Sequence, residues 1–163
     1  MGEPQFPRGT RREVDEGMHR ILVCLDASSR APFVLEAAAD LAKKSGAKLF
    51  LLRAVGIPPE LDKLVSVQQG ADLIDTMTAR AKDELETMAR NVPPESLDGI
   101  HVHIGTPWDT ICREAKTLDI DLVVIGSHGY SGFDRILGTT AGKVVNHCDR
   151  SVLVVRDPAR SKS

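Results

Sequence analysis

A segment rich in glycine, from Gly126 to Thr139, holds the residue types and spacing best suited to ligand binding. It begins Gly126-Ser-His-Gly129 and ends Gly138-Thr139. Glycines have no Cβ and permit positive φ, so successive backbone N–H groups can turn toward an anion. Gly138 also precedes a predicted helix, whose first amides favour phosphate, and the Thr139 and Thr140 hydroxyls can donate as well. The segment predicts a backbone cradle for the phosphates of a nucleotide.

Simpler interpretations of the same residues stay open. Glycines after a strand can be plain turn formers that need no ligand. The string Gly138-Thr-Thr-Ala-Gly-Lys143 is not a P-loop, because it has one residue too few between its glycines and Val144 replaces the Ser or Thr that binds magnesium. His128 can contact a phosphate or can be only a polar loop residue.

Two further histidines, His101 and His103, lie on one face of a predicted strand. No cysteine or carboxylate with metal-ligand spacing accompanies them. We therefore expect solvated or hydrogen-bonded histidines and no metal site. No set of residues in the sequence predicts a catalytic centre.

Composition argues against several classes of partner. The net charge of -2 and the aromatic content of 4% leave no basic footprint for nucleic acid. No apolar run approaches the roughly 20 residues of a membrane span, and the N-terminus lacks the apolar core of a signal peptide. The three cysteines have no C-x-x-C spacing, which is typical of reduced thiols. We expect a cytoplasmic protein that binds neither nucleic acid nor membrane.

The elements that must position the glycine segment form an alternating series. Short apolar runs predict strands at residues 20–25, 48–55, 100–104, 122–125 and 151–155. Helical patterns separate them: one that Ser28 or Ser29 caps and Gly46 ends, one over 67–91, one that begins at Thr106-Pro107, and one over 139–148. This alternation predicts an α/β fold with an open, doubly wound, five-stranded parallel sheet in the order 3-2-1-4-5, Rossmann-like in type. We expect a flexible tail over 1–18, one domain over 19–157 and a short tail over 158–163.

The strand order makes strands one and four neighbours, and their carboxyl ends flank the topological switch point. Ligands of open parallel sheets bind in the crevice at that point. Asp26 leaves one side of it and Gly126 leaves the other. The Asp26 carboxylate can accept from a ribose hydroxyl or an adenine amine, or it can serve as an N-cap or Asx-turn residue.

Five segments in order resemble the universal stress protein family. They are Cys24-Leu-Asp26, Gly105-Thr-Pro-Trp-Asp109, Asp121-Leu-Val-Val-Ile-Gly-Ser-His-Gly129, Gly138-Thr139 and Ser151-Val-Leu-Val-Val155. The resemblance covers about residues 19 to 156. Members that bind ATP carry an Asp after strand one and a G-x-x-G, nine residues, G-[ST] pattern after strand four. Asp26, Gly126, Gly129, Gly138 and Thr139 match this pattern, but eight residues rather than nine separate Gly129 from Gly138.

The resemblance implies ATP as the ligand, with Mg²⁺ as the metal that would accompany it. It also implies that Cys24 and Leu25 flank the adenine, that Ala54 touches it, and that Ile125 and Thr140 border the phosphates. Family members pair their last strands, which implies a homodimer through the apolar edge Val152 to Val155.

The resemblance leaves three functions open. The first is a nucleotide-binding regulator or sensor of the stress response, with protein partners of its own. The second is a slow ATPase or phosphotransferase, in which Asp26 or His128 orients a nucleophile. The third is a dimeric interaction module that binds no nucleotide.

Overall fold

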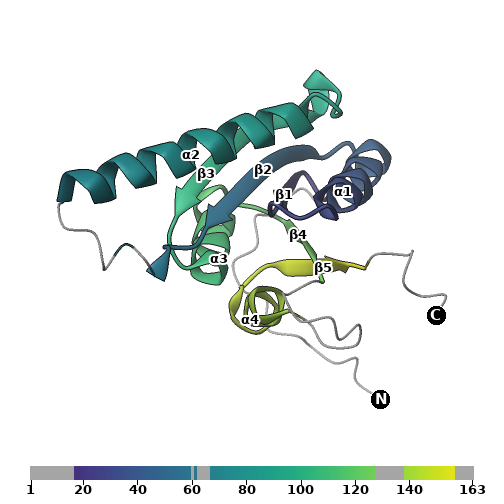
Figure 1. Ribbon diagram of the computed structural model, residues 1–163. Helices are drawn as coiled ribbons and strands as arrows, with labels where there is room; N and C mark the ends of the chain where they lie inside the picture. Colours follow the sequence, from purple (N-terminus) through teal and green to yellow (C-terminus); the bar gives the residue numbers. More distant parts are fainter. Residues whose placement is uncertain (1–16, 60, 62–66, 128–137, 157–163) are drawn as a thin grey trace, which may run out of the picture.

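The computed structural model describes residues 17–59, 61, 67–127 and 138–156. A parallel sheet lies between two layers of helices (Figure 1). The strands are β1 (Arg20–Cys24), β2 (Lys48–Val55), β3 (Leu97–Ile104), β4 (Leu122–Gly126) and β5 (Ser151–Val155). The α-helices are α1 (Ala31–Ser45), α2 (Val67–Ala89), α3 (Pro107–Thr117) and α4 (Thr139–His147), and a 3₁₀ turn, η2 (Pro94–Ser96), precedes β3.

The sheet order is β3-β2-β1-β4-β5, and every neighbouring pair of strands is parallel. This confirms the predicted fold and strand order. In the register, Cys24 at the end of β1 pairs with Leu52 on one side and Ile125 on the other. Ala54 of β2 pairs with His103 of β3. The carboxyl ends of β1 and β4 therefore lie side by side, as the switch point requires.

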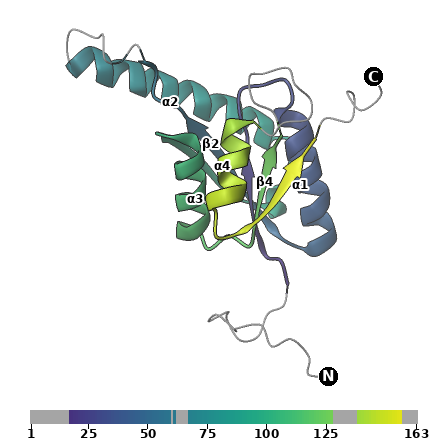
Figure 2. The ribbon, with the colours of Figure 1, turned by 90° about the horizontal axis from the view of Figure 1, so that it is seen from below.

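Alternation along the strands builds one apolar core on each face of the sheet. Ile21 and Val23 face the layer of α1 and α2, whereas Leu22 and Cys24 face the layer of α3 and α4. Figure 2 shows α3 and α4 lying together over that second face. Because both faces are covered, the central strands are largely apolar on both faces rather than in alternation, with Arg53 as a buried charged residue in β2.

The helix boundaries agree with the sequence to within two residues, but the cap of α1 does not. Gly46 adopts a left-handed φ of 74° and its N–H donates to Ala42, so it ends α1 as predicted. The prediction that Ser28 or Ser29 caps this helix is wrong, because Arg30 occupies the N-cap position. The reason is that the Ser28 hydroxyl donates to Asp26 at 2.6 Å, within the turn that follows β1.

One strand differs from the expectation in its extent, and one helix differs in its capping. β3 begins at Leu97, three residues earlier than predicted, and it runs through Gly99 while paired with β2. Thr106 is the N-cap of α3 as expected, although its side chain makes no capping hydrogen bond. Neither change moves the carboxyl edge of the sheet.

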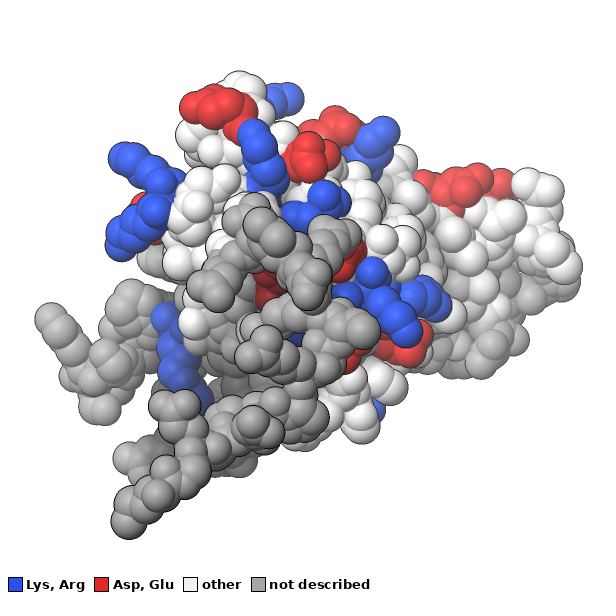
Figure 3. Space-filling model, turned by 180° about the vertical axis from the view of Figure 1, so that it is seen from behind, with Lys and Arg blue, Asp and Glu red and all other residues white. Residues whose placement is uncertain are grey.

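The surface carries charges of both signs. Figure 3 shows the face opposite to that of Figure 1, where Lys and Arg side chains are interspersed with Asp and Glu. None of the helices within the described ranges is long and apolar enough to cross a membrane. On this face the described side chains form no extended basic surface, in line with the low net charge.

Candidate functional site

The carboxyl ends of β1 and β4 bring the two sides of the predicted crevice together. The register pairs Cys24 with Ile125 at the carboxyl ends of the two strands, and Asp26 and Ser127 each follow two residues later. The N–H of Gly138 donates to the Ser127 carbonyl at 3.0 Å. The amino terminus of α4 therefore begins at the same edge of the sheet as Asp26.

The Asp26 side chain organises the turn after β1. Its Oδ1 accepts from the N–H of Ser28 at 3.0 Å and from the hydroxyl of Ser28. This is the Asx turn that the sequence left open. Both contacts among the described residues are made by Oδ1 of this exposed carboxylate, and none of those residues donates a hydrogen bond to Oδ2.

Gly126 is required where it stands by the packing of α1. A Cβ on Gly126 would lie 3.2 Å from the Cγ2 of Val34, which is tighter than ordinary contact. The close packing of α1 therefore explains why residue 126 is a glycine, whether or not a ligand binds there. Its lack of a side chain lets α1 approach the end of β4.

The amino terminus of α4 supplies the hydrogen-bond donors of the site. Gly138 is its N-cap, and the Gly138 carbonyl accepts the first helical bond from Gly142. The first amides of an α-helix have no acceptor inside the helix, which here concerns Thr139, Thr140 and the next residue. Thr139 is exposed and Thr140 is half-buried.

The remaining predicted contacts differ in their accessibility. Cys24, Leu25 and Ile125 are buried, and their side chains belong to the two cores. Burial raises the pKa of Cys24 far above its usual value, so this thiol stays neutral. Ala54 is half-buried at the end of β2. His128 and Gly129, with the rest of 128–137, lie outside the described residues.

A buried arginine beside the crevice was missed at the sequence level. Arg53 is 6% exposed, and its Nε donates to the carbonyl of Leu25, the residue before Asp26. Its Nη1 lies 3.0 Å from a carboxylate oxygen of Glu84 on α2, and Arg80 holds the other oxygen. Hydrogen bonds from Arg53 and then from Arg80 lower the pKa of Glu84. The available signal was a lone charge inside an otherwise apolar strand, which must be paired when buried.

An open groove of about 420 Å³ borders this arginine. It lies between the turn after β1 and α2, and Ser28 and Glu84 are among its lining residues. The Arg53 guanidinium thus ties the end of β1 to α2 and forms part of the groove wall. Because Glu84 balances its charge, Arg53 is suited to hold the turn in place rather than to bind an anion.

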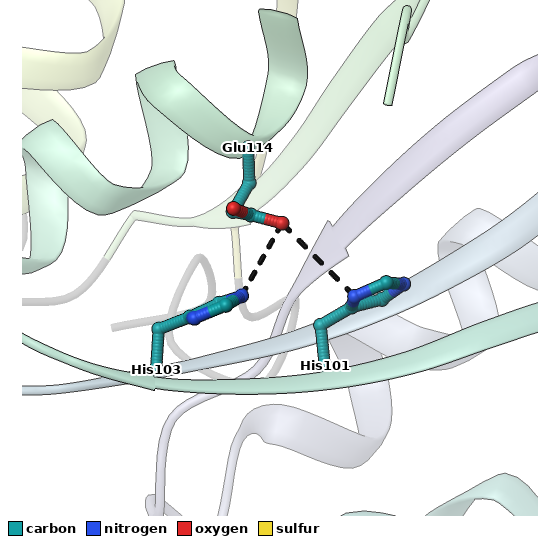
Figure 4. Close-up of side chains that lie close together, drawn as sticks. All are labelled: His101, His103 and Glu114. Atoms are coloured by element: carbon teal, nitrogen blue, oxygen red, sulfur yellow. Dashed lines mark ion pairs between the residues drawn. The ribbon is translucent and has the colours of Figure 1, made fainter. Parts of the chain in front are cut away.

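The structure places beside His101 and His103 a carboxylate that the sequence did not indicate. Glu114 of α3 points toward both imidazoles (Figure 4). Its Oε2 lies 3.3 Å from Nε2 of His103 and 4.0 Å from Nδ1 of His101. No carboxylate lies at metal-ligand spacing from the two histidines in the sequence, because Glu114 belongs to the next element, α3. The signal that was available is the position of Glu114 on the apolar stripe of its helix, three residues after Ile111.

Comparisons with known proteins agree on one family. The family model described as the universal stress protein family matches residues 17–156. The universal stress protein A homolog 2 of Coxiella burnetii is 31% identical over 136 residues, which are 83% of this chain and 92% of that protein.

Solved structures show the same fold. The universal stress protein UspA from Lactobacillus plantarum is 29% identical with a TM-score of 0.68, over 87% of this chain and 100% of that chain. A universal stress protein in complex with cAMP is 20% identical with a TM-score of 0.57, over 86% of this chain and 98% of that chain.

Proposed function

This chain belongs to the universal stress protein family, and from that premise we propose that it is a regulator of the stress response that binds an adenine nucleotide between β1 and β4. The observation that carries the proposal is the meeting of Asp26 and the amino terminus of α4 at one edge of the sheet. A carboxylate and a set of helix amides are complementary to the two ends of a nucleotide.

The proposed orientation follows from charge. The first amides of α4 and the Thr139 hydroxyl bind the phosphates, because the helix dipole favours anions at its amino terminus. Asp26 binds the ribose or the adenine through Oδ2, since a carboxylate would repel a phosphate. Arg53 holds the backbone before Asp26 and so fixes the distance between the two ends of the site.

We propose ATP as the nucleotide, with Mg²⁺ on its phosphates. The solved relative in complex with cAMP supports an adenine nucleotide as the ligand class. The match of Gly126, Gly129, Gly138 and Thr139 to the ATP pattern supports the triphosphate in particular.

Calorimetric titration of ATP, ADP and cAMP into nucleotide-free protein tests this proposal. We expect one ATP per chain, bound at least about tenfold more tightly than cAMP, because each additional charged hydrogen bond contributes roughly 1.5–3 kcal/mol. Asp26→Asn keeps the acceptor for Ser28 and removes the charge, so it should weaken ATP binding without unfolding the protein. Asp40→Asn, at an exposed position on α1, is the matched control. Absence of heat with any of the three nucleotides would contradict the proposal.

We further propose that the regulator is a homodimer joined through β5. Within the described residues, β5 pairs with the sheet on one side, along β4. The carbonyl of Val155 accepts from Ser127, so the alternate residues Val152 and Val154 direct their backbone groups to the free edge. Leu153 exposes 40% of its surface, and an open apolar edge of this kind favours pairing with a second chain.

Light scattering after size-exclusion chromatography tests the dimer. Val154→Pro removes an N–H that faces the free edge while it spares the β4 ladder, so we expect a monomer. Val154→Thr keeps the N–H and should remain a dimer. A monomeric wild type, or a Val154→Pro variant that stays dimeric, would disprove pairing through this edge.

A further inference from the structure

The two histidines of β3 and the glutamate of α3 form a compact group of donor atoms. Nδ1 of His101, Nε2 of His103 and a carboxylate oxygen of Glu114 all lie within 4.8 Å of one another. Figure 4 shows both imidazoles directed toward the carboxylate from one face of the strand. The rings stack with their centroids 6.4 Å apart.

These separations agree with those of ligands around one metal ion. Two atoms that each lie about 2.1 Å from a tetrahedral Zn²⁺ are about 3.4 Å from each other. The carboxylate oxygen lies 3.3 Å from one imidazole nitrogen and 4.0 Å from the other. The two imidazole nitrogens lie within 4.8 Å of each other, so a side-chain movement of about an ångström would bring all three atoms to ligand spacing.

The partial burial of the group favours a bound cation. The Glu114 side chain is 12% exposed, the His101 side chain 27% and the His103 side chain 41%. The His103 Nε2 atom itself is buried and lies 3.3 Å from Glu114 Oε2, but it makes no hydrogen bond among the described residues. A buried polar atom without a hydrogen bond is costly, and a bound ion would satisfy it. With neutral histidines the group carries one negative charge, which also attracts a cation.

Gly99 provides space for the His101 imidazole. It lies two residues before His101 on the same face of β3, and a Cβ at this position would be 2.6 Å from the His101 Nε2. Any side chain here would displace the ring and its Nδ1. This accounts for a glycine inside the strand, where glycine otherwise weakens the ladder.

We propose that His101, His103 and Glu114 bind one divalent transition-metal ion of the zinc type. Imidazole nitrogen suits Zn²⁺, Co²⁺, Ni²⁺ and Cu²⁺ rather than Mg²⁺ or Ca²⁺, which prefer oxygen. Three protein ligands leave a fourth position for water. The ion joins the edge strand β3 to α3, so it stabilises the folded chain.

Calorimetry with ZnCl₂ on the chelator-treated full chain tests the site. We expect one Zn²⁺ per chain with a dissociation constant in the micromolar range or below. His103→Ala and Glu114→Gln should each weaken binding by at least about tenfold. Gly99→Ala retains all three ligands and should also weaken binding, because it displaces the His101 ring. His147→Ala removes a histidine elsewhere and should leave the affinity unchanged.

Co²⁺ absorption identifies the ligands independently of affinity. Tetrahedral Co²⁺ bound by nitrogen and oxygen gives visible bands, and it lacks the near-ultraviolet charge-transfer band of a cobalt thiolate. That band would assign the metal to Cys112 or Cys148 instead and overturn the proposal. Equal Zn²⁺ affinity in wild type and His103→Ala, or no Zn²⁺ binding by the wild type, would overturn it too. Circular dichroism of each variant confirms that the fold is kept.

Discussion

Replacing Arg53 by methionine tests whether this buried guanidinium holds the end of β1 in place. Methionine keeps most of the apolar volume of the side chain and removes the donors to Leu25 and Glu84. Arg80→Met is a matched control, because Arg80 contacts the same carboxylate, also at 3.0 Å, but is 82% exposed. The two variants remove the same chemical group at opposite degrees of burial.

The two variants should differ in their loss of stability, because Arg53 is buried and Arg80 is exposed. Arg53→Met leaves the Leu25 carbonyl without its partner in a buried setting, which costs about 1–3 kcal/mol. The ion pair with Glu84, which is 37% exposed, adds up to about 1 kcal/mol. We therefore expect a loss of about 2–4 kcal/mol in the free energy of unfolding. Arg80→Met should cost about 0.5 kcal/mol or less, because it breaks an exposed pair four residues apart on a helix.

Urea denaturation followed by circular dichroism measures both variants. A loss of 2–4 kcal/mol is a large share of the roughly 5–15 kcal/mol that stabilises an ordinary domain, so the midpoint should fall by about 1 M or more. Equal midpoints for Arg53→Met and Arg80→Met would refute the reasoning. They would mean that water or another group replaces the guanidinium at the Leu25 carbonyl.

Three shorter predictions follow from other contacts. Arg53 and Arg80 hold the folded-state pKa of Glu84 below its usual 4.5. Their contacts with the Glu84 carboxylate therefore stabilise the protein above pH 4.5, and this stabilisation is lost as the pH falls through the lowered pKa. Glu84→Gln should therefore flatten the decline of melting temperature in acid, and an unchanged profile would contradict this. Gly126→Ala should cost about 1 kcal/mol of stability, because its Cβ crowds Val34 of α1, and an unaltered urea midpoint would show that α1 can move. Burial, reinforced by Cys148, raises the pKa of Cys112 to about 12, so iodoacetamide at pH 8 should alkylate this thiol at least about tenfold more slowly than glutathione; an equal rate would indicate an exposed thiolate.

The sheet could be predicted from the sequence because its signal is local. Parallel strands covered on both faces are continuous apolar runs, and the preference for right-handed crossovers leaves few possible strand orders. The carboxyl ends of β1 and β4 followed from that order, and with them the meeting of Asp26 and Gly138. The glycine segment between those ends could be recognised only by its spacing.

The partners of charged side chains could not be predicted because they come from distant elements. Glu84 reaches Arg53 from α2, and Glu114 reaches His103 from α3. Nothing in the spacing of either pair indicates the contact. The error at Ser28 has a different cause, since a serine before a helix can cap it or join the preceding turn, and the Asp26 carboxylate decides between them.

The pairing of Ala54 with His103 has a thermodynamic consequence. Partners in adjacent parallel strands point to the same side of the sheet and lie about 4.8 Å apart, so the proposed nucleotide contact and a proposed metal ligand occupy neighbouring positions in one row. Two ligands bound so close together both order the same stretch of backbone in β2 and β3. Any factor by which Zn²⁺ changes the affinity for ATP must equal the factor by which ATP changes the affinity for Zn²⁺. A single measurement of either ligand in the presence of the other therefore gives the coupling free energy of both.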